Sequence, residues 1–576
     1  MIIQKLQQVI FKALKEAITS GEINLSEIPE IKIEQPKDSK FGDYSSSIAL
    51  NLAKPLKMTP VKIAEIIKKF VKDDNIDSIE VVNPGFINFR LSMNCLRENL
   101  RQIQIHQKDY GKVNIGKNQK ILLEYISANP TGPLHIGHGR WAVLGDSLAR
   151  LMKTAGFDLV TEFYINDAGS QVFNFGNSIK VRYLQLLQRK FPELTEEINN
   201  KYTSLFELFK KDKEPNSEGL FYHGDYINDL AFSIFEKYKK DYIDSPVEKF
   251  ADFGMNLIIK NQKKVLEKLG VKFDIWFKES DLHKNGEVDK IIDFLNKNNQ
   301  TIKKEGALWL KTSEYGLKKD EVLIKSNGDK TYFLTDIAYH KNKFDRGFEK
   351  LINIWGADHH GHVPRMKAAI QALGKSPDSL YVILGQMVNL YRGKERIRMS
   401  KRSGEIITTE EIIEEVGSDA TRYLLLLRGA NTPIDFDIEL AKKQSSENPV
   451  FYVQYAHARI CSIFRQAQTK ISFNEEKMKE ADLSLLNSPQ ERILLLRLMS
   501  FIDEIINAVF LLEPYKLTKY AENLATDFHQ FYTNCKVIDP DNISLTYARL
   551  NLCNGTKIVL RNLLEDILGV NAPQIM

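Results

Sequence analysis

The stretch Lys120–Ala155, KILLEYISANPTGPLHIGHGRWAVLGDSLARLMKTA, contains the pattern that decides the fold. Its apolar, β-branched run from Ile121 to Ile126 predicts a buried strand, and the turn residues that follow predict a tight loop. Beyond the loop, apolar residues recur every three or four positions, which is typical of one face of a helix. A second apolar run, Asp158–Ile165, predicts the next strand. The sequence therefore predicts a βαβ unit, the building block of a doubly wound nucleotide-binding sheet.

Two histidines, His135 and His138, fall at the N-terminus of the predicted helix. The first turn of a helix carries unpaired N–H groups and the positive end of the helix dipole, so it favours phosphate. Imidazoles at this position can donate to phosphoryl oxygens, and Gly137 has no side chain to keep a flat base away from the backbone. The pattern indicates triphosphate chemistry, and the structural alternative is a pair of histidines that only cap and pack the helix.

The string ANPTGPLHIGH resembles the first signature of class I aminoacyl-tRNA synthetases, and the longer EYISANPTGPLHIGHGR is most similar to arginine-tRNA ligases. The resemblance implies a Rossmann-like catalytic domain that binds ATP along the signature. The residues that it assigns to ATP binding here are Ala128, Asn129, Pro130, Thr131, Gly132, Pro133, Leu134, His135, Ile136, Gly137 and His138.

A basic segment, RIRMSKRSG at 396–404, suits a loop that clamps phosphate, although such a loop alone is more often a surface feature. Beside the first signature it resembles the second signature of class I synthetases. It departs from the fullest form, because Arg398 replaces the first lysine and Arg402 the final serine. The resemblance adds Met399, Ser400 and Lys401 to the ATP-binding residues. The resemblance assigns the catalytic role to His135, His138 and Lys401.

Carboxylates at two places raise the question of a cationic substrate. Glu124 lies inside the otherwise apolar first strand. Tyr332, Asp336 and His340 are four apart, so a helix would put them on one face. A carboxylate that faces a cleft needs a cation, and a guanidinium would pair with it in planar geometry, whereas the alternative for Asp336 is an ordinary surface position. The resemblance assigns arginine binding to Glu124, Asn129, Tyr332 and Asp336.

Two further polar clusters follow predicted strands. Asn166, Asp167 and Gln171 could line the ligand pocket or could simply form a turn with its own caps. The run Asp358–His362, DHHGH, contains residue types that bind zinc or iron. Its adjacent histidines would point apart, and we predict no metal site there. The resemblance instead places this segment beside the ATP ribose and the amino acid.

The composition limits the classes of protein. The chain has 576 residues, with 80 basic against 75 acidic residues, so any affinity for nucleic acid must come from local patches rather than bulk charge. Its four cysteines are widely spaced and form no CxxC pair, which supports neither a zinc knuckle nor a disulfide framework. We expect a cytoplasmic protein without export signal or membrane segment.

The sequence predicts three domains. Residues 1–110 form a small α+β domain, whose strings GDYSSSIALNLAK and NPGFINFRL resemble the tRNA-contacting N-terminal domain of arginine-tRNA ligases. Residues 111–404 form the Rossmann-like catalytic domain, with a helical insertion at about 172–265. Residues 405–576 are predicted to be helical, with a turn at Asp435–Asp437 and a long helix at Leu440–Phe464.

The long helix carries an aromatic stripe, which is normally core. The resemblance places it in an α-helical anticodon-binding bundle, where aromatic rings can stack on bases. On that basis Tyr452, Tyr455 and Arg459 are predicted to bind tRNA.

The sequence thus predicts a multidomain α/β enzyme, with a doubly wound parallel sheet, an N-terminal α+β domain and a C-terminal all-α bundle. The resemblance implies a monomer that uses ATP with Mg²⁺ to form arginyl-adenylate and charge tRNA(Arg), and that needs bound tRNA for activation. The rivals are a synthetase for glutamate, lysine or cysteine, a small nucleotidyltransferase, and a non-catalytic tRNA-binding paralogue. The acidic residues Glu124 and Asp336 argue against a synthetase for glutamate. The absence of a set of cysteines and histidines that could bind zinc argues against a synthetase for cysteine.

Overall fold

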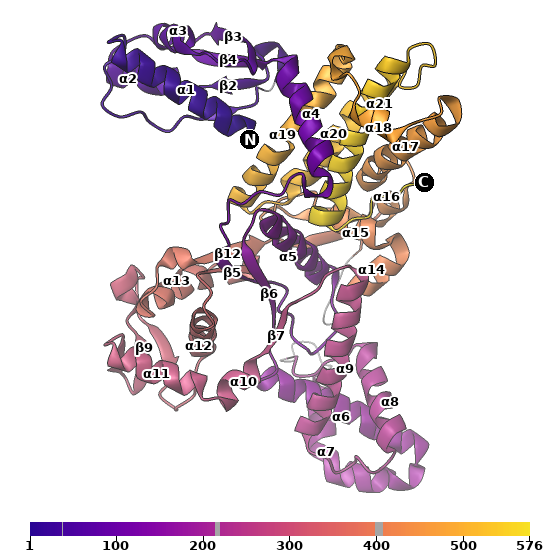
Figure 1. The fold of residues 1–576 in the computed structure, drawn as a ribbon. Helices are drawn as coiled ribbons and strands as arrows, with labels where there is room; N and C mark the ends of the chain where they lie inside the picture. The colour runs from indigo at the N-terminus through magenta and orange to yellow at the C-terminus, as the bar shows by residue number, and fades with distance from the viewer. Residues whose placement is uncertain (37, 213–218, 398–406) are drawn as a thin grey trace. The chain divides into compact units, whose positions relative to one another are not determined.

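The computed structural model describes residues 1–576 except 37, 213–218 and 398–406 (Figure 1). The chain forms two compact units. Unit 1 consists of Met1–Val113 and Ser445–Met576, and unit 2 consists of Asn114–Gln444. The predicted division at 110 and 404 remains a prediction about domains, and the units are described one at a time.

Unit 2 is built on a five-stranded, fully parallel sheet in the order β12-β11-β5-β6-β7. Its strands are β5 (Lys120–Glu124), β6 (Asp158–Ile165), β7 (Ile275–Lys278), β11 (Lys350–Gly356) and β12 (Leu380–Gly385). The chain runs outward from β5 through β6 to β7 and then returns to the other side of β5. The point where the strand order reverses therefore lies between β5 and β11, and the predicted doubly wound sheet is confirmed.

Helices cover both faces of this sheet. Helix α5 (Ile136–Thr154) packs on β5 and β6 (Figure 1). Leu122, Leu351 and Leu380 lie in register on neighbouring strands and face α12 (Tyr332–Asp345) and α13 (His362–Ala372) in a common core. Since alternate residues of a strand share a face, the side chain of Glu124 points to the same side as Leu122.

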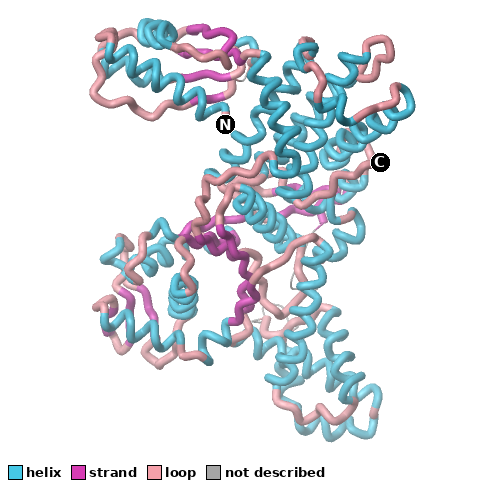
Figure 2. The backbone as a smooth tube through the Cα atoms, in the orientation of Figure 1, coloured by secondary structure: helices cyan, strands magenta, loops and turns pink. Residues whose placement is uncertain are grey.

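The insertion between β6 and β7 is helical, as predicted (Figure 2). Its helices pack around buried aromatic and aliphatic side chains such as Phe175, Tyr183 and Phe250. The helices are α6 (Ser170–Lys190), α7 (Thr195–Lys211), α8 (Asp225–Tyr238) and α9 (Val247–Lys268).

A small layer lies between β7 and α12. Its antiparallel sheet has the order β10-β9-β8. Its elements are α10 (Glu279–Lys284), α11 (Glu287–Lys297), β8 (Thr301–Lys304), β9 (Ala307–Leu310) and β10 (Glu321–Ile324).

The last part of unit 2 contains a second small sheet, in the order β14-β13-β15. The predicted turn at Asp435–Asp437 was wrong: these residues belong to β15 (Ile434–Asp437), which runs parallel to β13. Ile434 and Phe436 are buried there while Asp435 is exposed, so the segment alternates as a strand does. The neighbouring elements are β13 (Val388–Arg392), β14 (Glu395–Ile397), α14 (Thr409–Val416), α15 (Ser418–Leu425) and α16 (Ile438–Lys442).

Unit 1 begins with an α+β layer whose antiparallel sheet has the order β1-β2-β4-β3. Its strands are β1 (Ile33–Glu34), β2 (Tyr44–Ser46), β3 (Ile76–Val82) and β4 (Phe86–Leu91). Its helices are α1 (Ile2–Thr19), α2 (Ile48–Leu56) and α3 (Pro60–Phe70).

Helix α4 (Met93–His106) then packs on α19 and α21 of a helical bundle. The bundle contains α17 (Pro449–Lys470), α18 (Glu475–Lys479), α19 (Pro489–Leu511), α20 (Tyr515–Asn534) and α21 (Ile543–Arg561). The prediction of one helix over Leu440–Phe464 was wrong. The chain breaks at 443–448 between α16 and α17, because a helix rarely continues into proline and Pro449 instead starts α17.

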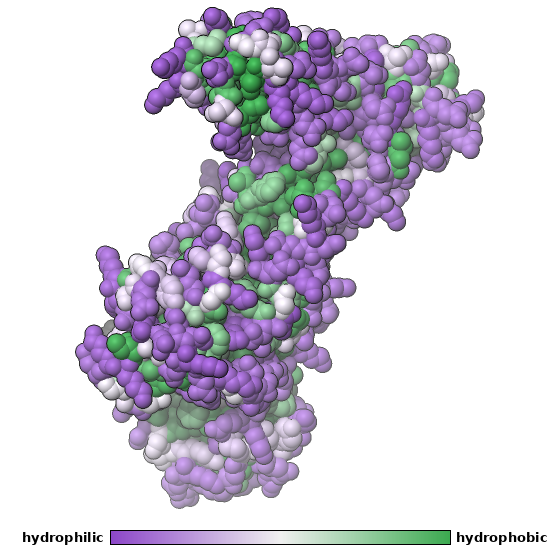
Figure 3. All heavy atoms as spheres, turned by 60° about the vertical axis from the view of Figure 1, so that its left-hand side comes forward, coloured by the Kyte–Doolittle hydropathy of each residue, from purple (hydrophilic) through white to green (hydrophobic). Residues whose placement is uncertain are grey.

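Hydrophilic side chains cover most of the molecular face drawn in Figure 3. None of the helices in the described parts of the chain has the length and apolar character that crossing a bilayer requires.

Candidate active site

The candidate site lies where β5 and β11 end, at the reversal of strand order. The predicted strand extended to Ile126, but β5 ends at Glu124 because Ile126 and Ser127 have φ values of 68° and 45°. A left-handed β-branched residue is a backbone outlier, and such outliers concentrate at functional sites. The turn lets the Ser127 hydroxyl donate to Oε1 of Glu124 at 2.9 Å.

The insertion helices hold the loop that follows. The Tyr226 hydroxyl of α8 donates to the carbonyl of Thr131 at 2.8 Å. Nε2 of Gln262, a buried residue of α9, donates to the carbonyl of Gly132 at 3.1 Å. Asn129 donates through Nδ2 to Gln171 at 2.7 Å. The predicted ATP-binding loop is therefore fixed in place by helices far away in sequence.

His135 and His138 form the cap of α5. Nδ1 of His135 accepts from the backbone N–H of Gly137 at 3.1 Å, and Nδ1 of His138 accepts from the backbone N–H of His135 at 3.3 Å. The rings stack with centroids 3.7 Å apart. A neutral imidazole that accepts through Nδ1 carries its proton on Nε2. Both histidines therefore cap the helix, as the structural alternative expected.

The segment after the second signature touches the first signature. Thr409 donates from its backbone N–H to the carbonyl of Leu134 at 2.7 Å and from its hydroxyl to the carbonyl of His135 at 2.8 Å. The second-signature residues themselves, Arg398, Met399, Ser400, Lys401 and Arg402, lie outside the described residues.

Glu124 is buried and already has a cationic partner in α12. Oε2 of Glu124 accepts from Nζ of Lys343 at 2.5 Å, and both side chains are almost completely buried. On the neighbouring strand, the buried Glu162 accepts two hydrogen bonds from Arg346 and one from the Tyr339 hydroxyl. Two internal ion pairs thus fix the end of α12 to the sheet.

A third polar contact orders the same helix. The imidazole of His340 donates through Nδ1 to the carbonyl of Asp336 at 2.8 Å and accepts from Nδ2 of Asn353 on β11 at 3.0 Å. Burial, reinforced by the nearby Lys343, holds the pKa of His340 well below its usual value. His340 is therefore neutral and structural.

Tyr332 and Asp336 lie on the same face of α12, one turn apart, as predicted. Tyr332 is largely exposed, and its hydroxyl lies next to Gly169, the residue that precedes α6. Asp336 is 37% exposed and its Oδ2 lies 2.8 Å from Nε2 of His362. These residues and Asn129 come from different loops and helices around the carboxyl ends of the strands.

Glu279 is a site residue that the sequence reasoning missed. It follows β7 directly, it is buried, and it is hydrogen-bonded to the Tyr164 hydroxyl. Burial, with a smaller contribution from the negative charges of Asp336 and Asp167, raises its pKa to about 7, although the hydrogen bond with Tyr164 acts in the opposite direction. Glu279, Asp336 and Tyr164 therefore lie close enough to influence one another electrostatically, and these three residues are called the acidic pocket below. The signal was available, because polar residues at the carboxyl ends of parallel strands are ligand candidates.

The predicted tRNA-binding residues lie in unit 1, between α17 and α20. Tyr452 and Tyr455 lie against the ring of His529, with centroids 5.0 and 5.9 Å away. The Arg459 guanidinium stands over the rings of Tyr455 and Tyr532 at 4.9 and 5.3 Å. All three predicted residues are half-buried, so they contribute to helix packing and keep a solvent-facing edge.

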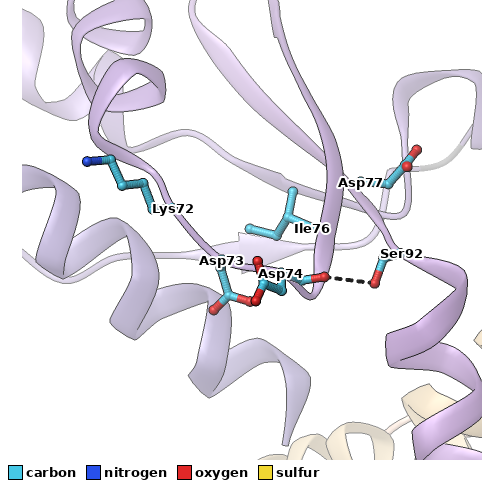
Figure 4. A pocket seen from close by; sticks show the side chains of 6 residues that line it. All are labelled: Lys72, Asp73, Asp74, Ile76, Asp77 and Ser92. Carbon is cyan, nitrogen blue, oxygen red and sulfur yellow. Dashed lines mark hydrogen bonds between the residues drawn. The ribbon is translucent and has the colours of Figure 1, made fainter.

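A separate pocket lies in unit 1, with a volume of about 550 Å³ (Figure 4). The Ser92 hydroxyl on its wall donates to the carbonyl of Asp74 at 3.0 Å and caps α4. These contacts are structural. The lining residues are Lys72, Asp73, Asp74, Ile76, Asp77 and Ser92.

Three family models match this chain. The model described as "tRNA synthetases class I (R), catalytic domain" matches residues 99–432. The arginyl tRNA synthetase N-terminal domain model matches residues 4–91, and the DALR anticodon binding domain model matches residues 453–576.

Curated relatives match over the whole chain. An arginine–tRNA ligase of Heliobacterium modesticaldum is 42% identical, over 100% of this chain and 99% of the relative. One of Caldanaerobacter subterraneus is 43% identical, over 100% and 98%. Among solved structures, a putative arginyl-tRNA synthetase of Campylobacter jejuni has 34% identity and a TM-score of 0.72, over 84% of this chain and 100% of that one. Arginyl-tRNA synthetase of Thermus thermophilus shares the fold, with a TM-score of 0.73 at 22% identity over 100% of both chains.

Proposed function

Because this chain belongs to the arginyl-tRNA synthetase family of class I aminoacyl-tRNA synthetases, we propose roles for its residues in that family's reaction. The enzyme uses ATP to ligate L-arginine to tRNA through an arginyl-adenylate, and it releases AMP and pyrophosphate. The arginine carboxylate attacks the α-phosphorus of ATP, pyrophosphate leaves, and a terminal ribose hydroxyl of the tRNA then takes the arginyl group. The observation that carries the residue roles is the histidine pair at the N-terminus of α5, at the reversal of strand order.

We propose that His135 and His138 act as donors to the phosphates of ATP. Their Nδ1 atoms accept from the backbone, and both rings stand at the N-terminus of α5, where the helix dipole and the first-turn N–H groups favour phosphate. Negative charge that grows on the phosphates in the transition state is stabilised by these donors, by the N-terminus of α5 and by Lys401. The loop Ala128–Leu134 would hold the nucleotide, together with Met399 and Ser400.

We propose that the guanidinium of arginine binds in the acidic pocket. Asp336 supplies a carboxylate next to solvent, and Glu279 supplies one that is buried. Tyr332 would contact the same substrate, and Asn129 would contact the α-amino group of that substrate. For Glu124 the structure favours an indirect contribution, because its carboxylate is paired with Lys343, which fixes the helix that carries Asp336.

We propose that tRNA(Arg) binds through unit 1. The N-terminal model matched at residues 4–91 and the anticodon-binding model matched at 453–576 support a proposal in which the first part contacts the tRNA elbow and the last the anticodon. Tyr452, Tyr455 and Arg459 would offer their exposed edges to unstacked bases.

We also propose that Mg²⁺ enters with ATP, as the counter-ion of its phosphates. The structure shows no group of three or more His, Cys, Asp or Glu side chains that could hold a metal ion among the described residues. We propose a monomer that works in the cytoplasm, where its four free cysteines would stay reduced.

ATP–pyrophosphate exchange with each of the twenty amino acids, with and without total tRNA, tests this assignment. We expect exchange with arginine alone, and only when tRNA is present. Exchange with another amino acid would contradict the proposal that the acidic pocket binds arginine. A lack of exchange under every condition would point to the non-catalytic paralogue.

Asp336→Asn tests the pocket directly. The variant removes the charged partner of the desolvated guanidinium, so arginine binding should be weakened by roughly 2–5 kcal/mol of binding free energy. Steady-state aminoacylation would show this as a higher KM for arginine with the KM for ATP unchanged. An unchanged arginine KM would remove Asp336 from the pocket.

A further inference from the structure

Asp336 has a fixed hydrogen-bond donor. Nε2 of His362 lies 2.8 Å from Oδ2 of Asp336. An ionised carboxylate only accepts, so Nε2 carries the proton. Among the described residues, no other side chain forms a hydrogen bond with the Asp336 carboxylate. His362 thus engages one carboxylate oxygen of Asp336, and the second oxygen has no donor among these side chains.

The His362 ring is itself held by its neighbours. His362 is the first residue of α13, directly after the polar run that follows β11, and its side chain is 18% exposed. The Trp355 ring of β11 lies 5.4 Å from it, and the Phe333 ring of α12 meets it edge-on at 5.9 Å. Rings from two elements therefore fix the direction of the Nε2–H bond.

The direction of that bond matters for a guanidinium. Two carboxylate oxygens can bind a guanidinium side by side only when the planes of the two groups align. An aspartate that is 37% exposed, on the first turns of a helix, would otherwise rotate about its side-chain bonds. The hydrogen bond from the fixed imidazole restricts this rotation, because it holds Oδ2 of Asp336 in one direction.

We propose that His362 is a positioning residue, which sets the plane of the Asp336 carboxylate for the guanidinium of substrate arginine. The inference rests on the proposed binding of arginine by Asp336. On this proposal, His362 of the DHHGH run serves the binding of an organic substrate rather than the binding of a metal.

The test is steady-state aminoacylation of tRNA(Arg) by the full chain with His362→Ala, His362→Gln and His362→Asn. The amide nitrogen of glutamine reaches about as far as Nε2 of histidine, and that of asparagine stops near Nδ1. We expect His362→Ala and His362→Asn to raise the arginine KM roughly tenfold or more, the effect of one charge-assisted hydrogen bond. We expect kcat and the ATP KM to stay unchanged, since only arginine binding is affected. His362→Gln should restore the arginine KM.

The double variant Asp336→Asn/His362→Ala separates this inference from the proposed function. If His362 acts through Asp336, the double variant will have the arginine KM of Asp336→Asn alone. If Asp336→Asn leaves the arginine KM unchanged, the proposed pocket fails, and this inference fails with it. If Asp336→Asn raises it but the alanine and asparagine variants do not, only the inference is overturned. Equal effects of Gln and Asn, or a raised ATP KM, would show a merely structural role and also overturn it.

Discussion

Glu279 is a carboxyl group of the candidate site whose pKa the fold raises. Its pKa of about 7 lies above the ordinary value of 4.5, so the folded chain keeps a proton that the unfolded chain has lost. The folded state is therefore penalised as pH rises from 4.5 to 7, and the full penalty is present above pH 7. An arginine guanidinium would remove this penalty when it binds.

Glu279→Gln should stabilise the substrate-free protein at pH 8 relative to the wild type, by a few kcal/mol at most. The difference should shrink as pH falls toward 4.5, because the wild-type carboxyl group is then protonated as well. Urea unfolding of both proteins at pH 5 and pH 8 measures it. A difference that is the same at both pH values would contradict the raised pKa.

Lys401→Ala tests the second signature, which lies outside the described residues. Loss of a donor to the growing phosphate charge should lower kcat by about 10²–10³. Pre-steady-state formation of arginyl-adenylate in the presence of tRNA measures this step. ATP turnover at the wild-type rate would show that Lys401 does not clamp phosphate.

The local residues of the site could be predicted and their distant partners could not. His135 and His138 stand out because strand, loop and helix follow one another within 36 residues. Lys343 lies 219 positions from Glu124, and no local pattern marks it as the partner of that carboxylate. Glu279 directly follows β7, but its burial and its proximity to Tyr164 leave no mark in the local sequence.

At the scale of elements, Arg140 connects α5 to the segments around β13 and β15. Its buried guanidinium donates to the carbonyls of Gln386 at 2.8 Å, Gly429 at 2.9 Å and Thr432 at 2.7 Å. Burial without a carboxylate partner lowers its pKa to about 10. One side chain of the first-signature helix thus ties together backbone from two later stretches of the chain.

Arg140→Lys keeps the charge but loses the planar fork, so an ammonium cannot reach both stretches. We expect it to destabilise the protein by about 1.5–3 kcal/mol, the value of one hydrogen bond to a charged group. Urea unfolding measures this. Arg365→Lys is the control, because that half-exposed arginine pairs with Glu321 in contact with solvent and should change stability by less than about 1 kcal/mol. Equal effects would contradict the connecting role of Arg140.

The elements were predictable where apolar periodicity was long, as in α5, and were missed where it was short. Two aspartates in Ile434–Asp437 gave the composition of a turn, and only pairing with β13 makes this segment a strand. Likewise, Pro449 starts α17 instead of continuing an earlier helix.

At the scale of the whole molecule, unit 1 joins segments from both ends of the sequence. Arg492 of α19 donates to both carboxylate oxygens of Asp43, at 3.2 and 2.8 Å, and the same carboxylate accepts the backbone N–H of Leu91. Composition and periodicity carry no signal of such proximity, so the sequence did not reveal this pairing.

Asp43→Ala should leave Arg492 largely buried without its partner and destabilise unit 1 by about 3–5 kcal/mol. Differential scanning calorimetry would show the transition of unit 1 at a lower temperature and that of unit 2 unchanged. Asp38→Ala is the matched control, since its pair with Lys40 is exposed and its loss should leave both transitions in place. A shift of both transitions by Asp43→Ala would contradict an effect confined to unit 1.

The order of synthesis adds a consequence of this two-part unit. Helix α4 packs on α19 and α21, yet the roughly 330 residues of Asn114–Gln444 are translated between them. At ~5–20 residues per second, the ribosome needs roughly 15–65 s for that stretch. During this interval the apolar side of α4 has emerged while the helices that cover it do not yet exist. Nascent unit 1 therefore completes its core only after the residues of unit 2 have been synthesised.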